Sequence, residues 1–350
     1  DPLEGRALLT GTSIAGALRS YLREREFGYR HDGGPEALHN RLFGRQEDDE
    51  GEQSWLITFD SLSDSSPHIE LRDGVALNPK TRTAEDKKKF DFELLAAGTH
   101  FKLRFELLIP QGENNDLLLG LAIALQGLQN GEIALGARKR RGLGRCRVKE
   151  WKVTRYDLTT TAGLLGWLNQ TEYYRTGTCI AELLGVQADL DKRESFSIDA
   201  TFRLDGSLLI RSSVGDLSSP DAVHLRSNRK GMQVPILSGT SLAGALRTRA
   251  LRIVKTVAIN NNASQFIEDL FGKNIHSSSD RPTASRLITA ESEIASPLDL
   301  VHSRIKIDRF TGGPFPTALF SEQPVYGKND TVIKVKIDIQ QPSNAHIGLV

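Results

Sequence analysis

Two widely separated stretches of the chain carry hydrophobic residues at helical spacing. The apolar positions of the first stretch are Ile14, Leu18, Tyr21 and Leu22, and those of the second are Leu242, Leu246, Ile253 and Val254. Such spacings place the side chains on one face of a helix. Both stretches therefore predict an amphipathic helix that packs this face against a core.

The same short sequence opens both predicted helices. "LTGTSIAGALR" occupies residues 9–19 and "LSGTSLAGALR" occupies residues 237–247, with nine of the eleven positions identical. Hydroxyl side chains suited to a helix N-cap are Thr12, Ser13, Thr240 and Ser241. The free N–H groups and the dipole of such a terminus suit a phosphate, and a well-capped structural helix is the alternative. We call this Gly-Thr-Ser sequence the GTS motif.

The repeat continues beyond the two helices. "LFG" at 42–44 recurs at 270–272, 228 residues later, and "SWLITFD" at 54–60 corresponds to "SRLITAE" at 285–291, 231 residues later. "LNPKTRT" from Leu77 aligns with "IDRFTGG" from Ile307, 230 residues later. Short matches in the same order at a nearly constant offset indicate a tandem of two homologous modules.

Merging the two copies gives one complete unit. A strand ("FSIDATFRLDGSLLIRS") precedes the GTS helix, and a strand ("WLITF", "RLITA"), a hairpin and another strand ("HFKLRFELLI", "TVIKVKIDI") follow it. A helix ("DLLLGLAIALQGLQNG") and a last strand ("CRVKEWKV") complete the unit. The order βαββαβ predicts an α+β fold of two tandem ferredoxin-like, or RNA-recognition-motif-like, modules with inserted hairpins.

These elements also set the expected domain boundaries. We expect a first module at 1–156, an inter-module bridge at 157–194 and a second module at 195–350. The first copy lacks the strand that precedes the GTS helix in the second copy, so we expect the first strand of the first module to lie outside the chain. The C-terminal part of the second module is expected to lie outside it as well.

Charge is balanced over the chain and concentrated locally. Lys and Arg number 45 and Asp and Glu 44, so net charge does not indicate a polyanionic partner. Local basic clusters do occur, in "EDKKKF", "GARKRRGLGRCR" and "LRSNRKG". The two cysteines allow at most one disulfide and no zinc site, which favours the reducing cytoplasm. No apolar run approaches the length of a membrane span.

The second of these basic clusters combines glycine and cationic residues. Gly136, Gly142 and Gly144 permit close approach of the backbone to a ligand, and the charges come from Arg138, Lys139, Arg140 and Arg141. The segment is no Walker loop, because no Gly-Lys-Ser/Thr follows. Its place before the last strand of an RNA-recognition-type fold favours binding to RNA.

Together these features resemble the RAMP superfamily, specifically the backbone subunits of type III CRISPR effector complexes. The resemblance is carried by the two GTS motifs, "RLFG" and "DLFG", the hairpin sequences "ALNPKTRTA" and "IKIDRFTGG", and "GARKRRGLGRCRV". A fused pair of such modules is most similar to the multi-domain subunits of type III-D systems. The implied partners are the CRISPR guide RNA, the target RNA and other subunits of the complex, with no membrane.

The resemblance implies that each module binds guide RNA and that its hairpin, or thumb, inserts between guide and target. The thumbs would be 72–95 and 302–325, with Phe310, Phe315 and Phe320 as candidate wedges. The implied RNA-binding residues are Gly11, Thr12, Ser13, Arg19, Lys80, Arg82, Arg138, Lys139, Arg140, Arg141, Gly239, Thr240, Ser241, Arg247, Lys306 and Arg309.

The resemblance also implies an acidic residue in the loop before the GTS helix in members that cut target RNA. Asp221 is the best match in the loop 212–239, and Asp216 is the reserve. Asp221 would hold a divalent ion, Mg²⁺ being favoured, or help to activate the ribose 2′-OH. The implied product is a 2′,3′-cyclic phosphate. A turn residue after Pro220 is the alternative for Asp221, and His224 is either an assistant or structural.

Three interpretations of the function follow. The first is a metal-dependent endoribonuclease subunit that cuts guide-complementary target RNA, and the second is a scaffold of the same complex that binds guide RNA without cutting. The third is a stand-alone RNA-processing enzyme of the superfamily, which requires a histidine-centred site that the eight histidines do not suggest. Asp60 and Glu291, which end equivalent strands, are expected to be structural in preference to RNA contacts.

Overall fold

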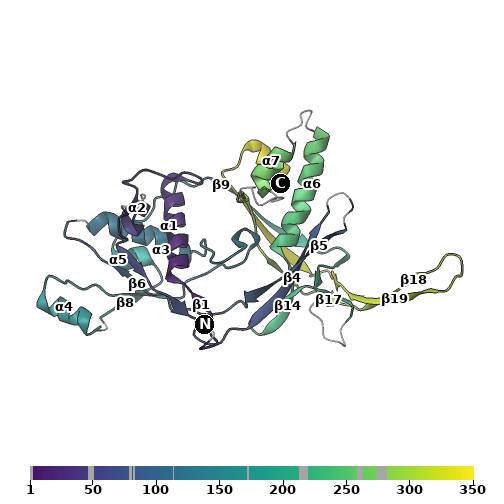
Figure 1. The fold of residues 1–350 in the computed structure, drawn as a ribbon, viewed down its shortest axis with the longest axis horizontal. Coiled ribbons are helices and arrows are strands. Elements are labelled where there is room, and N and C mark those ends of the chain that lie inside the picture. Colours follow the sequence, from purple (N-terminus) through teal and green to yellow (C-terminus); the bar gives the residue numbers. More distant parts are fainter. Residues whose placement is uncertain are drawn as a thin grey trace.

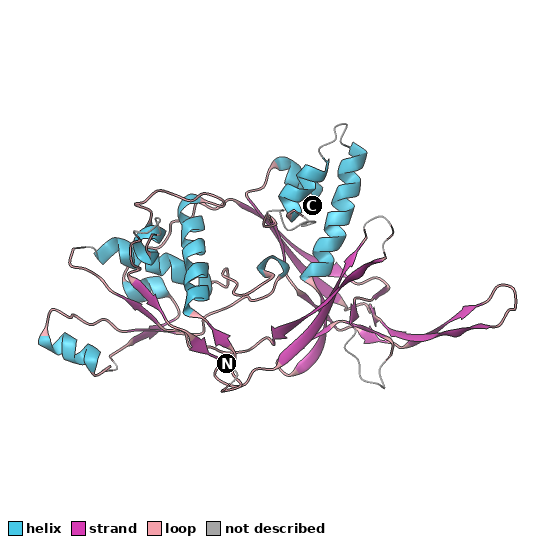
Figure 2. Cartoon of the chain, viewed as in Figure 1, coloured by secondary structure: helices cyan, strands magenta, loops and turns pink. Residues whose placement is uncertain are grey.

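The chain forms two lobes of mixed α+β structure, each with its own helices (Figures 1 and 2). The computed structural model describes residues 3–45, 51–78, 81, 83–112, 114–171, 173–212, 220–257, 263–273 and 282–350. Eight α-helices occur within these ranges, and their sheets are small and mostly antiparallel. The α+β class agrees with the prediction.

The first lobe contains the first GTS helix and four further α-helices. The helices are α1 (Gly11–Phe27), α2 (Leu38–Phe43), α3 (Asn114–Gln129), α4 (Thr161–Leu168) and α5 (Ile180–Leu184). The strands are β1 (Leu8–Leu9), β2 (Leu56–Thr58), β3 (Ser61–Leu62), β4 (Ile69–Leu77), β5 (Ala84–Leu95), β6 (Phe105–Leu107), β7 (Trp151–Val153) and β8 (Arg175–Gly177), with a 3₁₀ turn η1 at Lys139–Arg141.

The second lobe contains the second GTS helix and the larger sheet. Its helices are α6 (Gly239–Val257), α7 (Ala263–Phe271) and α8 (Asn344–Leu349). Its strands are β9 (Ser195–Arg203), β10 (Ser207–Leu208), β11 (Arg211–Ser212), β12 (Ala222–His224), β13 (Arg226–Arg229), β14 (Met232–Leu237), β15 (Leu287–Thr289), β16 (Ser292–Ala295), β17 (Leu298–Asp299), β18 (His302–Ile307), β19 (Pro314–Gln323), β20 (Val325–Tyr326) and β21 (Val332–Gln340).

Strand pairing repeats between the lobes in the same register. β2 pairs antiparallel with β6, and its counterpart β15 pairs antiparallel with β21. β1 pairs with β3 through Leu9 and Ser61, and β14 pairs with β16 through Leu237 and Ser292. Each lobe also inserts a hairpin between these strands, β4–β5 in the first and β18–β19 in the second. The tandem repeat of the sequence therefore corresponds to a repeat of strand order and register.

Neither lobe shows the full βαββαβ order within the described residues. The second lobe has the strand before the GTS helix, β9, which pairs with β21 along its whole length, and only the short α8 follows β21. The first lobe has α3 and β7 after β6, but β6 pairs only with β2 among the described strands. Several predicted strands are also shorter than expected, since β6 and β7 span three residues each.

Each lobe is stabilised by its own hydrophobic core. The first core is built around Ile14, Leu18 and Leu22 of α1 and the apolar face of α3. It also includes Ile180 of α5, so part of the segment expected to be a bridge packs with the first module. The second core joins α6 and α7 to the inner face of the sheet formed by β9, β15 and β21.

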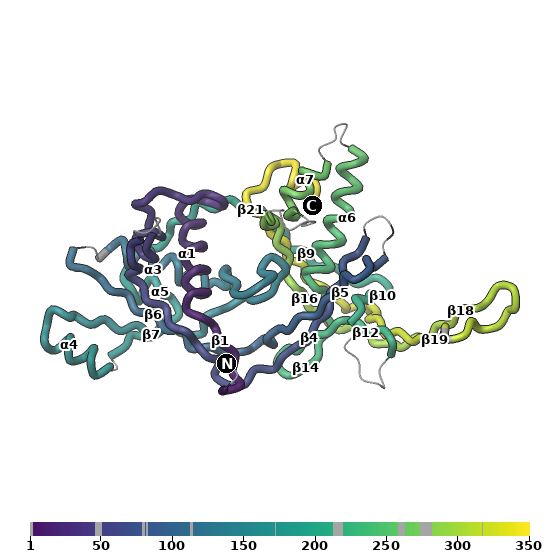
Figure 3. Tube along the Cα trace, in the orientation of Figure 1, coloured from purple at the N-terminus to yellow at the C-terminus, as the bar shows by residue number. Residues whose placement is uncertain are grey.

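The first hairpin reaches across to the second lobe, whereas the second hairpin projects away from both (Figures 1 and 3). Arg72 of β4 binds Glu291 of the second lobe with an Nη1–Oε2 distance of 2.5 Å, and Glu70 accepts a hydrogen bond of 2.7 Å from the Asn228 N–H. Both hairpins have a register shift at the matching place near the tip, just before Leu77 and just before Ile307.

Candidate RNA-binding site

The capping hydroxyls of both GTS helices lie one residue before the GTS motif. The Ser13 N–H donates to the Thr10 side chain (3.4 Å), and the Ser241 N–H donates to the Ser238 side chain (3.2 Å). The assignment of Thr12, Ser13, Thr240 or Ser241 as N-caps is therefore wrong, because each helix already begins at the glycine. These four side chains are exposed on the first turn and are free of the capping role.

The GTS glycine is required by close packing. A Cβ on Gly11 would overlap the Thr58 carbonyl oxygen, and a Cβ on Gly239 would come within 2.6 Å of the Thr289 carbonyl oxygen and closer to that of Arg141. Each glycine therefore lets the helix start directly against the strand that follows it. At Gly239 the other close neighbour, Arg141, belongs to the glycine-rich loop of the first module.

Replacing Gly239 with alanine is expected to lower the melting temperature, because backbone atoms on two sides must move to admit the methyl group. Gly244 on the same helix is the matched control, since a Cβ there meets nothing within 4 Å. Gly244→Ala should stabilise the protein by about 0.5–1 kcal/mol through helix propensity. Thermal melts of the two variants check this; equal shifts in one direction would contradict it.

An acidic residue distinguishes the N-termini of the two GTS helices. In the first module the Gly11 N–H donates to Asp60 Oδ1 at 2.6 Å, so a carboxylate already occupies this terminus. The counterpart of Asp60 in the second module is Glu291, which instead pairs with Arg72 and Arg229. The expectation that both acids are structural agrees with these contacts, and the terminus of α6 has no such acid among the described hydrogen bonds.

The glycine-rich basic loop of the first module packs against the second module. Arg140 donates to the Gln340 side chain, and Arg141 donates to the Leu287 carbonyl oxygen at 3.3 Å. Arg138 lies over the rings of Phe90 and Phe92 in the first hairpin, with its Cζ 4.7 and 4.6 Å from their centroids. Two of the predicted RNA-binding arginines thus serve in part as contacts between modules. Arg138 and Lys139 remain exposed.

Positive charges gather where this loop meets α6. Burial lowers the pKa of Arg141, and the nearby charges of Arg247, Arg140 and Arg138 lower it further. Burial also lowers the pKa of Arg247, opposed by Glu268. We call Arg138, Arg140, Arg141 and Arg247 the arginine cluster. Its like charges repel one another beside the N-terminus of a helix, so an anion bound there would be stabilised by charge and by the helix dipole.

The counterpart of Arg247 in the first module has a different role. Arg19 donates to the Asn40 side chain at 2.8 Å and thereby ties α1 to α2. The matched arginines of the two copies are therefore not equivalent in their surroundings. Of the two matched arginines, Arg19 and Arg247, only Arg247 belongs to the arginine cluster.

The second hairpin exposes apolar and basic side chains along its length. Phe310 at the tip is fully exposed, and Phe315 and Phe320 are 42% and 43% exposed. Lys306 lies over the Phe315 ring with its Nζ 4.6 Å from the centroid, and Arg309 is exposed beside Phe310. The arrangement offers rings and cations on one projecting arm, which suits stacking on bases and contact with phosphates.

Asp221 lies at the base of this hairpin. Its Oδ2 accepts hydrogen bonds from the Ser321 N–H (2.7 Å) and the Ser321 hydroxyl (3.2 Å), which joins β12 to β19. These hydrogen bonds, the backbone one first, lower the pKa of Asp221 below its ordinary value. The side chain is exposed, so an ionised carboxylate faces solvent beside the projecting arm.

His224 has a structural role. It is 1% exposed, its Nδ1 accepts from the Ile210 N–H (3.2 Å), and its Nε2 lies 3.0 Å from the Ile236 carbonyl oxygen. An accepting Nδ1 places the proton on Nε2, and burial lowers the pKa of the ring, so the imidazole is neutral. Both ring nitrogens are thus occupied by backbone groups, and assistance in cleavage is the wrong interpretation.

Three predicted site residues, Asp216, Lys80 and Arg82, lie outside the described residues. Among the residues the structure describes, no group of three or more His, Cys, Asp or Glu side chains is arranged to hold a metal ion. Cys146 and Cys179 are free thiols. No helix in the described ranges is long and apolar enough to cross a bilayer.

One contact of the site has a partial signal in the sequence, and another has none. Alternation of Phe90 and Phe92 in "KFDF" places both rings on one face of the hairpin, and the cationic partner could be any exposed arginine. Ser321, the partner of Asp221, carries no signal, because it lies 100 residues away along the chain.

Comparison with known proteins identifies the family of this repeated unit. A family model of the RAMP superfamily matches residues 2–147 and 201–345, which are the two copies seen in the structure. No curated protein matches the chain. RAMP proteins are CRISPR-associated, bind RNA and generally work in effector complexes with other subunits. The chain therefore belongs to the RAMP superfamily and carries two of its modules.

Proposed function

We propose that the protein is a guide-RNA-binding backbone subunit of a type III CRISPR effector complex, of the fused, type III-D-like kind, and that it cuts target RNA at Asp221. The observation that carries the RNA-binding part is the arginine cluster. Residues from both modules assemble it where η1 meets α6: the Arg141 carbonyl oxygen lies against Gly239, the first residue of the helix, and Thr240 and Ser241 of the same first turn are exposed. Cations, hydroxyls and free N–H groups in one place suit a phosphate of the guide backbone.

The hairpins supply the second part of the proposal. A projecting arm with a fully exposed Phe310 at its tip can insert between guide and target and interrupt their base stacking. Lys306 and Arg309 would contact the neighbouring phosphates. The first hairpin is held against the second lobe by Arg72, which would fix the spacing between the two interruptions.

Cleavage is assigned to Asp221 because of its position and charge. A carboxylate with a lowered pKa is a weak base, so it acts better by holding a cation or by orienting the ribose 2′-OH than by removing its proton unaided. The 2′-OH gives its proton to water as its oxygen attacks the adjacent phosphorus; the bond to the 5′-oxygen breaks, that oxygen takes a proton from water to leave as a 5′-hydroxyl, and the other product is a 2′,3′-cyclic phosphate. Mg²⁺ commonly takes one or two carboxylates with the substrate's phosphates. At Asp221 it would take most ligands from RNA and water, and would neutralise the phosphate charge.

The alternative function is a scaffold that binds guide RNA without cutting. It is favoured by the two hydrogen bonds from Ser321, which give Asp221 a structural task between β12 and β19. The variants that separate cutting from scaffolding are substitutions of Asp221 and Ser321. Guide binding is common to both alternatives.

Guide binding is tested by replacing one member of the arginine cluster. Arg247→Gln should weaken binding of the guide RNA and reduce the slope of log K against log salt by about 0.7, the effect of one lost phosphate contact on a single strand. Arg249→Gln is the matched control, because Arg249 is exposed on the same helix and points away from Arg247. Filter binding over a salt series measures both; identical slopes for the two variants would reject the proposed phosphate site.

A further inference from the structure

A row of exposed cations follows the extended segment that leads from the glycine-rich loop into β7. Cys146, Val148, Trp151 and Val153 of this segment pack against the first core. Successive side chains of an extended segment point to opposite sides, so the residues that alternate with these four point away from the core. We call the exposed cations among them the basic row, which consists of Arg145, Arg147, Lys149 and Lys152.

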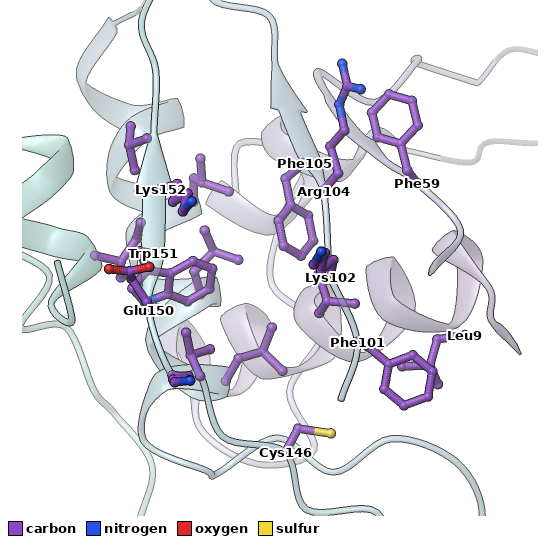
Figure 4. Close-up of a pocket in the computed structure, with 18 of the residues that line it drawn as sticks. Leu9, Phe59, Phe101, Lys102, Arg104, Phe105, Cys146, Glu150, Trp151 and Lys152 are labelled. Carbon is purple, nitrogen blue, oxygen red and sulfur yellow. The ribbon is translucent and has the colours of Figure 1, made fainter. Parts of the chain in front are cut away.

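Two more cations lie across a pocket from the basic row, on the segment that leads into β6. Lys102 and Arg104 are exposed, whereas Leu103 and Phe105, which alternate with them, pack against the first core. Figure 4 shows Lys102 and Arg104 on one side of the pocket and Lys152 on the other. Both sets of cations therefore point away from the same core and border the same pocket.

Most of these cations have no carboxylate partner. Among the described residues, Lys102 and the four members of the basic row form no ion pair, and Arg104 pairs with Glu106 at an exposed site where such pairs contribute little. Glu150 is the acid within the segment of the basic row, and Asp60, which borders a second pocket with Lys102, accepts a hydrogen bond from the N-terminus of α1. A cluster of unpaired cations on one face is the electrostatic footprint of a surface that binds a polyanion.

Aromatic rings lie beside the cations on both sides of the pocket. The Lys152 Nζ is 4.8 Å from the centroid of the Tyr174 ring, and the Arg104 Cζ is 4.9 Å from that of Phe59. Tyr174 is 44% exposed, and its neighbour Tyr173 is 85% exposed. Exposed rings next to cations suit a single-stranded nucleic acid, because unpaired bases stack on the rings while the cations contact the phosphates.

The repeat provides an internal comparison for this face. Matching the strand pair β2–β6 with β15–β21 makes Lys334 the counterpart of Lys102. Lys334 is also exposed, but the strand beside it, β9, directs Ser197, Asp199 and Thr201 to this face, and none of these is a cation or a ring. Lys334 therefore has the same place in the fold as Lys102 without a basic row beside it, which makes it a matched control.

We propose that the outward face of the first lobe, formed by Lys102, the basic row and Tyr174, binds single-stranded RNA. Phosphates of the RNA contact the cations and unpaired bases stack on Tyr174, so the site accepts any base sequence. Single-stranded flanks of the guide and of the target present this same chemistry. Lys149, Lys152 and Tyr174 lie between the two stretches that the RAMP family model matches, so the site is a feature of this chain and not of the shared module. It is separate from the arginine cluster and does not depend on cleavage at Asp221.

An acidic protein surface is the competing occupant, because it would also neutralise the cations. Alternate residues of an extended segment lie about 6.6 Å apart along one line, which suits a line of phosphates better than carboxylates scattered over a protein surface. The rings beside Lys152 and Arg104 add a stacking surface that a carboxylate would not use. The face therefore fits RNA better.

Lysine acetylation read by mass spectrometry tests the proposal on the guide-loaded complex. The probe is a single-stranded oligouridylate of about 12 nucleotides, a length within the range that single-stranded binding sites cover, without complementarity to the guide. The probe should slow acetylation of Lys102, Lys149 and Lys152 and leave that of Lys334 unchanged. Protection that precedes the probe and survives ribonuclease would assign the face to a protein subunit and overturn the proposal. Protection that ribonuclease removes would identify a guide flank, and protection that needs a flanked target would identify the target; both uphold it.

Filter binding of the same probe over a salt series measures the contacts. Lys102→Gln should lower the slope of log K against log salt by about 0.7, and Lys149→Gln combined with Lys152→Gln by about 1.4, the effects of one and two lost phosphate contacts. Lys334→Gln should leave the slope unchanged. Equal effects of Lys102→Gln and Lys334→Gln would overturn the proposal. Weakening by Arg247→Gln alone would place the probe at the arginine cluster, which overturns the proposed face and leaves the proposed function standing.

Discussion

Replacing Asp221 with asparagine is expected to lower the rate of target-RNA cleavage by at least about 100-fold, the usual effect of losing a group that acts on the transferred proton or its oxygen. Asparagine keeps an oxygen that can accept the hydrogen bonds from Ser321, so the contact between β12 and β19 should persist. The loss then reflects the missing charge. Single-turnover cleavage of a labelled complementary RNA by the assembled complex in Mg²⁺ provides the measurement.

Ser321→Ala is the matched control for this prediction. It removes the 3.2 Å bond that the hydroxyl donates to the carboxylate and the 3.3 Å bond that it accepts from the Asp221 N–H. The carboxylate and its 2.7 Å bond from the Ser321 N–H remain, so cleavage should stay within a few-fold of the unmodified complex. Undiminished cleavage by Asp221→Asn would show that Asp221 is not the cleaving residue, and Asp216→Asn would then decide between the reserve residue and the scaffold alternative. Equal losses in Asp221→Asn and Ser321→Ala, with weaker RNA binding, would make Asp221 structural.

The repeated elements could be predicted from the sequence because their signals are local. The apolar spacing from Ile14 to Leu22 gives α1, the alternation at 332–340 gives β21, and the constant offset gives equivalent hairpins. The N-caps lie two or three residues before the predicted positions, because the glycine itself begins each helix and the residue before it supplies the hydroxyl. The local sequence pattern thus predicted each helix correctly but not the side chain that caps it, Thr10 or Ser238.

Contacts between distant segments could not be predicted. Charge alone suggested that Arg140 and Arg141 bind RNA, but the structure gives each a partner in the second lobe, and only the fold brings those partners near. The sequence repeat also suggested two equivalent sites. Asp60 accepts a hydrogen bond from the N-terminus of α1, whereas its counterpart Glu291 pairs with Arg72 and Arg229. The N-termini of α1 and α6 therefore differ in whether a carboxylate binds them.

The Glu291 carboxylate is at the centre of the contact between the first hairpin and the second lobe. The side chains of Arg72, Glu70 and Glu291 are 7%, 9% and 5% exposed, and Arg229 also pairs with Glu291. Arg72→Ala would leave two buried carboxylates with fewer positive partners. Removing one partner of a buried pair destabilises by about 3–5 kcal/mol, and the remaining Arg229 favours the lower end.

The expected result of Arg72→Ala is therefore release of the first hairpin. Hydrogen exchange in β4 and β5 should accelerate and the melting temperature should fall, while the core of α1 and α3 keeps its protection. Arg304→Ala in the second hairpin is the matched control, because Arg304 is 60% exposed and its pair with Glu322 should contribute at most about 1 kcal/mol. If both variants melt alike, the Arg72 pair does not hold the hairpin. A larger effect of Arg72→Ala, with Glu291→Ala adding little to it, would show that these two residues act as one unit across the modules.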